Sequence, residues 1–178
     1  QIVFIFLIAV LLMGVSQSFF PSYPWQSINP LPHAKAKSAI LFIGDGMGPT
    51  FLTATRLYQG GSKHKLFMES LPVTGLSKTH SSDGYVTDSA ASATALATGV
   101  KSYNGSIGMS DPALEQDGQS KKLKTITDLA LAAGKSVGII TTDKITGASP
   151  AAFYAHAKER GEAEYIAPQL LNSGVSLF

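Results

Sequence analysis

Two short segments of the sequence place oxygen-bearing side chains where chemistry could occur. The first is Gly44-Asp45-Gly46-Met47-Gly48, which lies between an apolar run and a proline that can open a helix. Its glycines allow a sharp turn, from which the Asp45 carboxylate could reach a metal. The plainer alternative is an ordinary Asp-Gly turn. The glycine spacing does not match a dinucleotide-binding motif and no P-loop sequence is present, so nucleotide binding is not supported.

The second segment places a hydroxyl at the start of an alanine-rich stretch, where Ser89 follows Asp88. Backbone N–H groups and the helix dipole at such a position favour a phosphate or an alkoxide, so Ser89 is a candidate nucleophile. Either Asp88 or Ser89 could instead simply cap the helix. No Gly-x-Ser-x-Gly elbow occurs and no histidine stands out as a general base. An ionised serine would therefore need a metal.

The composition narrows the class of protein. The chain has 178 residues, of which 44% are hydrophobic and 15% charged, enough apolar material for one buried core. The formal net charge is only +2 and the lysines are scattered, so nucleic-acid binding has no support. Cysteine is absent, so any metal must use oxygen or imidazole ligands.

The first 37 residues differ from the rest. Residues 1–18 contain an apolar run ending in small polar residues, which predicts a secretory signal and export to the periplasm or the extracellular space. A membrane anchor is the alternative, but the run is shorter than the roughly 20 apolar residues of a span, so no stable span is expected. The proline-rich stretch 19–37 predicts a linker or arm. The chain starts without Met, and both of its ends are expected to be cut.

The elements that would position Asp45 and Ser89 follow a strand, loop, helix order within a domain spanning 38–178. Apolar or alternating runs predict strands, two of them buried, and helical spacing or helix-start signals predict the intervening helices. This order favours an α/β fold, a three-layer α/β/α sandwich around a largely parallel sheet with its chemistry in the loops at the strand ends. The predicted strands are 38–43, 73–79 and 136–141, and the predicted helices are 49–58, 89–98, 123–133 and 151–160.

Three linked motifs resemble those of alkaline phosphatases. They are the segments 43–48 (IGDGMG), 85–95 (YVTDSAASATA) and 98–105 (TGVKSYNG). Their order and spacing also fit, and the likeness runs from about residue 38 to residue 160. The resemblance implies an alkaline phosphatase-like fold, incomplete here, and hydrolysis of a broad range of phosphate monoesters. It also implies zinc and magnesium as cofactors, and a homodimer is possible by analogy.

The resemblance further implies a role for individual residues. Asp45 would bridge a zinc and a magnesium, and Ser89, ionised on zinc, would attack phosphorus to form a phosphoserine. Ser149 would give a hydroxyl to the magnesium, although it could instead cap a helix before a proline. Arg160 would grip the phosphate with its planar fork, steadied by Asp88. An isolated arginine near a helix end is usually just solvated.

The sequence also departs from the family. The remaining metal ligands are expected beyond the end of this chain, so the isolated chain is expected to be inactive. Gly147 stands where relatives often carry Asp or His near the magnesium, and His156 is interpreted as structural. The other histidines show no ligand spacing. Two alternatives stay open: a phosphodiesterase or sulfatase of the same superfamily, against which the segment around Ser89 argues, and a non-catalytic phosphate-binding domain.

Overall fold

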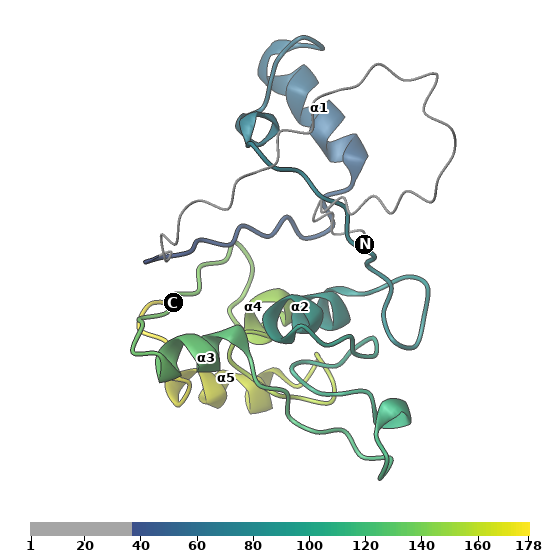
Figure 1. The fold of residues 1–178 in the computed structure, drawn as a ribbon, viewed down its shortest axis with the longest axis vertical. Coiled ribbons are helices and arrows are strands. Elements are labelled where there is room, and N and C mark those ends of the chain that lie inside the picture. The colour runs from purple at the N-terminus through teal and green to yellow at the C-terminus, as the bar shows by residue number, and fades with distance from the viewer. Residues whose placement is uncertain (1–36) are drawn as a thin grey trace, which may run out of the picture.

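The computed structural model describes residues 37–178 of the chain. The predicted signal segment and nearly all of the predicted linker lie outside the described residues. Within them, five α-helices and two short 3-10 helices are joined by turns and extended segments (Figure 1). The α-helices are α1 (Pro49–Gly60), α2 (Ser89–Thr98), α3 (Ile126–Ala132), α4 (Ala148–Ala151) and α5 (Ala163–Leu171), and the 3-10 helices are η1 (Phe67–Ser70) and η2 (Pro112–Leu114).

The first two helices begin and end at the residues that helix signals predict. Pro49 opens α1, where a missing N–H costs nothing, and the helix ends at Gly61, whose φ of 82° suits glycine. Asp88 caps α2 because its side chain accepts a hydrogen bond from the backbone N–H of Ala91. Gly99, in the left-handed conformation, ends α2. The predicted bounds of α2 are therefore confirmed, and those of α1 are two residues short.

The second half of the chain differs more from the prediction. The predicted helix 151–160 is wrong, because α4 ends at Ala151 and the chain then turns away. Ala157 instead exchanges two backbone hydrogen bonds with Ile107, and the side chain of Gln169 bonds the backbone N–H and carbonyl of His156. These partners satisfy backbone groups that a continuing helix would have paired internally. The sequence did not indicate α5, which carries Pro168 in its interior.

The three predicted strands are extended but form no ladder among residues 37–178. One parallel bridge joins Gly138 to Leu177, and two antiparallel bridges lie elsewhere in this part of the chain. The predicted burial of 38–43 on both faces is wrong here, since Phe42 is 89% exposed. The segment 136–141 keeps a strand-like alternation, with Ile139 packed on the core and Ile140 84% exposed. The predicted three-layer sandwich is therefore not assembled among residues 37–178.

The buried core lies between α2, α4 and α5. Small side chains line the contact of α2 with α4, which lets the two helix backbones approach closely. Ile107 and Ile166, both fully buried, fill the space beside them. In Figure 1 the helices α2, α3, α4 and α5 form one group, and α1 with η1 stands apart from them. The buried alanines of this core are Ala90, Ala93, Ala148, Ala151, Ala152, Ala155 and Ala157.

Candidate active site

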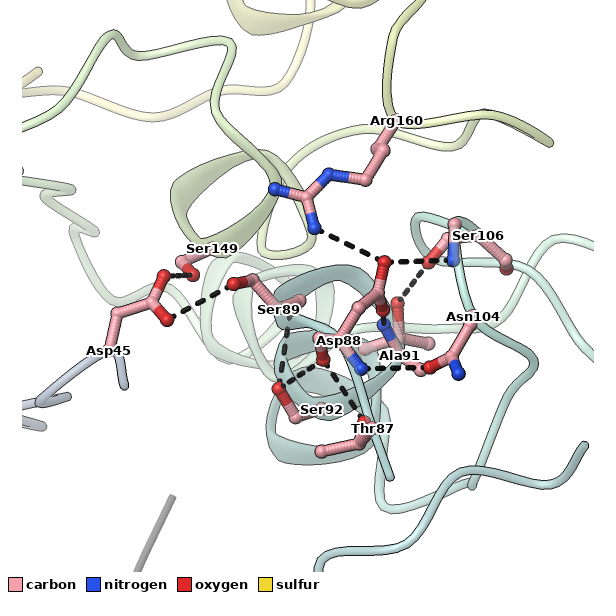
Figure 2. A network of polar contacts seen from close by, with 12 residues as sticks. Asp45, Thr87, Asp88, Ser89, Ala91, Ser92, Asn104, Ser106, Ser149 and Arg160 are labelled. Carbon is pink, nitrogen blue, oxygen red and sulfur yellow. Dashed lines mark hydrogen bonds and ion pairs between the residues drawn. The ribbon is translucent and has the colours of Figure 1, made fainter. Parts of the chain in front are cut away.

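The carboxylate of Asp45 lies between two serine hydroxyls from different helices. Ser89 Oγ donates a hydrogen bond of 3.0 Å to Asp45 Oδ1, and Ser149 Oγ donates one of 2.7 Å to Asp45 Oδ2 (Figure 2). Ser89 and Ser149 lie 44 and 104 positions from Asp45 along the chain. The structure thus brings together three of the residues that the sequence singled out. Each carboxylate oxygen faces a separate hydroxyl.

The residues at the N-caps of α2 and α4 determine where the hydroxyls of Ser89 and Ser149 lie. Asp88 acts as the N-cap of α2, which leaves Ser89 as the first helical residue with its hydroxyl turned toward Asp45. Gly147 is the N-cap position of α4, so Ser149 lies inside the first turn rather than at the cap. The capping alternative therefore does not hold for either serine. Ser89 is 4% exposed, and that burial restricts the directions from which a reactant could approach it.

Asp88 and Arg160 form the second part of the site. Arg160 Nη1 lies 3.1 Å from Asp88 Oδ2, and the same oxygen accepts a 3.0 Å hydrogen bond from Gly105 N. Asp88 Oδ1 accepts a 2.9 Å bond from Ala91 N. Figure 2 shows the guanidinium of Arg160 reaching the carboxylate of Asp88. Since Arg160 is partly exposed, its remaining N–H groups can bind an anion from solvent.

Two further residues hold this region and were not singled out from the sequence. Asn104 brackets the segment before Ser89 by accepting a 2.8 Å hydrogen bond from Asp88 N and donating one of 3.0 Å to Val86 O. The carboxylate of Asp83 accepts bonds from Ser81 Oγ and from Asn104 N, and the Ser81 hydroxyl chiefly lowers the pKa of Asp83. An asparagine in a turn is common and carries no local signal that could have predicted these contacts.

The residues at this site fit a metal in part. Divalent magnesium prefers oxygen ligands, and the site offers one carboxylate and two hydroxyls directed at one another. Among residues 37–178, however, no group of three or more acidic, histidine or cysteine side chains could hold a metal ion. Asp45, Ser89 and Ser149 would therefore supply part of a ligand set that needs further ligands.

Other residues considered from the sequence do not join the site. His156 Nε2 donates a hydrogen bond of 2.8 Å to the carbonyl of Leu123, a structural contact. His64 contacts Gln59, and His33 lies outside the described residues. At Gly147, a Cβ would come within 2.6 Å of Asp143 Oδ2, so the space that a side chain would enter there is taken. In the described part of the chain, no helix has the length and apolarity to cross a membrane.

Comparison with known proteins identifies the family of the chain. The family model described as alkaline phosphatase matches residues 36–174. Alkaline phosphatase 4 of Drosophila melanogaster is 40% identical over 133 residues, which cover 71% of this chain and 22% of the fly protein. The crystal structure of a cold-active alkaline phosphatase from Shewanella sp. superposes with a TM-score of 0.67 at 39% identity, covering 76% of this chain and 33% of that chain.

A third comparison concerns a metal. A mutant of the TAB5 alkaline phosphatase, described with Mg bound in its M3 site, matches with a TM-score of 0.50 at 40% identity. The match covers 55% of this chain and 26% of that chain.

The chain belongs to the alkaline phosphatase family. It spans about a quarter of the length of the curated relatives it matches.

Proposed function

We propose that the protein containing this chain hydrolyses phosphate monoesters through a phosphoserine formed at Ser89. The observation that supports this most is the pair of hydroxyl contacts on Asp45, since they place the oxygens of Ser89 and Ser149 at the two oxygens of one carboxylate. Membership in the alkaline phosphatase family supports the reaction class. The whole reaction depends on residues beyond those described here.

In the proposed reaction, Ser89 Oγ forms a bond to phosphorus as the bond from phosphorus to the alcohol oxygen breaks. The hydroxyl proton of Ser89, which faces Asp45 Oδ1, leaves as the oxygen attacks, and the departing alcohol oxygen takes up a proton. Water then cleaves the phosphoserine, which releases inorganic phosphate and restores the hydroxyl. The N-terminus of α2 favours the negative charge on the phosphoryl group throughout.

Arg160 is proposed to bind the phosphoryl oxygens. Its contact with Asp88 fixes one edge of the guanidinium and leaves N–H groups for the substrate. Asp88 thus acts through Arg160 and through the cap of α2, rather than on phosphorus. Because the grip is on the phosphate and not on the alcohol, a broad range of monoesters is expected.

Zinc and magnesium are the proposed cofactors. Asp45, Ser89 and Ser149 would provide oxygen ligands, and further ligands would come from outside the described residues. A bound divalent cation would lower the pKa of the serine hydroxyl and neutralise charge on the phosphoryl oxygens. With so few ligands, residues 1–178 alone are expected to be inactive.

The decisive test uses the whole protein that contains this chain and a chromogenic phosphate monoester. Replacing Ser89 with alanine should remove nearly all turnover, because the reaction then lacks its covalent nucleophile. Acid quenching should trap phosphate on the peptide that contains Ser89 in the unsubstituted protein only, as measured by mass spectrometry. Chelation should abolish turnover, and added zinc with magnesium should restore it.

Ser92→Ala is a matched control because Ser92 lies one turn further along α2 and its hydroxyl bonds only backbone carbonyls, those of Asp88 and Ser89. This variant should keep most of the activity. Turnover that survives in Ser89→Ala would contradict the phosphoserine. Phosphate binding without any turnover would favour the non-catalytic alternative.

Three wider properties are also proposed. The composition of residues 1–18 supports export, which the N-terminal sequence of the mature protein would test. Family membership supports a homodimer, which sedimentation would test, and a three-layer sandwich in the whole protein. In that sandwich the exposed extended segments of this chain would gain strand neighbours.

A further inference from the structure

Asn104 makes three hydrogen bonds to the backbone and side chains that precede Ser89. Its Oδ1 accepts from Asp88 N at 2.8 Å and its Nδ2 donates to Val86 O at 3.0 Å. The two bonds pair residues 86 and 88 with one side chain as a neighbouring strand would. In Figure 2 the amide of Asn104 faces Asp88 beside the start of α2. Only a primary amide offers a donor and an acceptor at this spacing.

The residue after Asn104 is tied to the proposed phosphate-binding arginine. Gly105 N donates to Asp88 Oδ2 at 3.0 Å, and Gly105 O accepts from Arg160 N at 2.7 Å. Gly105 has a φ of 90°, and a Cβ there would lie 3.2 Å from Glu159 Oε2. Residues 104 and 105 therefore hold the segment that ends in Ser89 with one set of bonds and Arg160 with another.

The two side-chain bonds of Asn104 to Asp88 N and Val86 O, called the bracket below, are supported by a backbone contact of the same residue. The backbone N–H of Asn104 donates to Asp83 Oδ1 at 3.0 Å, and Ser81 Oγ donates to the same oxygen at 2.7 Å. A carboxylate acceptor makes these bonds stronger than those between neutral groups. The backbone of Asn104 is thus bonded to Asp83, while its side-chain amide bonds the backbone of Val86 and Asp88.

We propose that Asn104 is a positioning residue that sets the orientation of Ser89 relative to Arg160. This inference rests on the proposed function, since it assumes that both residues meet the same phosphoryl group. Asn104 touches neither phosphorus nor the ester, and it acts through residues 86–88. Displacing a nucleophile by about 1 Å can lower turnover by about 100-fold even when the fold is unchanged.

The test compares Asn104→Asp and Asn104→Ala in the whole protein. Asp keeps the size of the side chain but loses the donor to Val86 O and places a charge beside it. We expect kcat to fall by about 10-fold to 100-fold, with a weaker inhibition by inorganic phosphate and an unfolding midpoint that changes little. Asn172→Asp is the matched control, because Asn172 Nδ2 also donates to a backbone carbonyl, that of Pro168 within α5.

Amide hydrogen exchange of the peptide covering residues 85–92 provides a readout that does not depend on activity. It should become faster in both Asn104 variants and stay unchanged in Asn172→Asp. Unchanged exchange would overturn the bracket, and faster exchange with unchanged kcat and phosphate inhibition would overturn the positioning role. If the unsubstituted protein has no turnover, the proposed function fails while exchange still tests the bracket. If Asn104→Asp does not fold, Asn104→Ala decides, because it introduces no charge.

Discussion

The region that carries most of the site and the region that precedes it differ in how their apolar side chains are covered. Residues 81–178, the site region, bury alanines of α2 and α4 together with Ile107 and Ile166. Residues 37–80, the leading region, bury little: α1 contains no buried residue, and Phe42 and Tyr58 are almost fully exposed. The site region is held by its own packing, and the leading region is held mainly by polar contacts.

Asp45 is the point at which the two regions meet. It comes from the leading region, yet its carboxylate accepts the hydroxyls of Ser89 and Ser149 from the site region. A second link is Lys101, whose ammonium donates to the carbonyls of Lys78 and His80 while burial lowers its pKa. The serines therefore lie on helices that pack in the core, whereas the carboxylate between them comes from a segment with few packed neighbours.

The largest effect is expected from removing apolar volume in the site region. Ile107 is fully buried, so Ile107→Ala should lower the free energy of unfolding by about 2–5 kcal/mol through lost burial and the cavity left behind. Tyr58 on α1 of the leading region is 93% exposed, and Tyr58→Ala should change the free energy of unfolding by no more than about 0.5 kcal/mol. Urea denaturation followed by circular dichroism measures both. Equal losses in the two variants would break the comparison.

A smaller loss of stability is expected from removing the two buried hydrogen bonds of the Thr94 hydroxyl. Thr94 is fully buried on α2, and its hydroxyl accepts from Gly108 N at 2.9 Å and donates to Ser106 O at 3.2 Å. Thr94→Val keeps the shape but leaves both backbone groups unpaired, so a loss of about 1–3 kcal/mol is expected in urea denaturation. Thr53→Val on exposed α1 is the control and should change the free energy of unfolding little. A Thr94 variant as stable as the control would show that water reaches this core.

The sequence predicted the helix starts of α1 and α2 because their signals are local. A proline at N1 and an aspartate at the N-cap act through neighbouring backbone groups, without any tertiary partner. The wrong helix 151–160 failed for the opposite reason. Its alanines suit a helix, but Ala157 pairs with Ile107 and Gln169 pairs with His156, and such distant partners leave no trace in a local pattern.

The candidate site shows the same limit. Asp45, Ser89, Ser149, Asp88 and Arg160 were found because their motifs resemble a known family and their residue types suit phosphate chemistry. Asn104 lies inside one of those motifs and was still missed, because its function depends on residues 86–88 lying beside it in space. Exposure of the predicted strands was missed as well, since a hydrophobic run predicts burial only when neighbouring strands are present.

The smallest effect on stability is expected from losing the ion pair between Arg56 and Glu69 in the leading region. Arg56 on α1 bonds the carboxylate of Glu69 at 2.7–2.9 Å, and Leu66 N donates to the same carboxylate at 2.8 Å. The Arg56 contact, and after it the Leu66 N–H, lower the pKa of Glu69 below its ordinary value of 4.5. Because the folded pKa is lower, the stabilisation is complete above about pH 4.5 and is lost as the pH falls through the folded value.

Glu69→Gln should therefore speed amide exchange in α1 at neutral pH, while the urea midpoint of the whole protein hardly moves, because both partners are exposed to solvent. In the unsubstituted protein, acidification should speed exchange in α1 once the chemical exchange rate is corrected for pH, and in Glu69→Gln it should add little. Glu164→Gln on α5 is the control and should leave α1 unaffected. If Glu69→Gln lowered the stability of the site region as much as that of α1, the two regions would unfold as one unit, and Asp45 would be held as firmly as the serines it contacts.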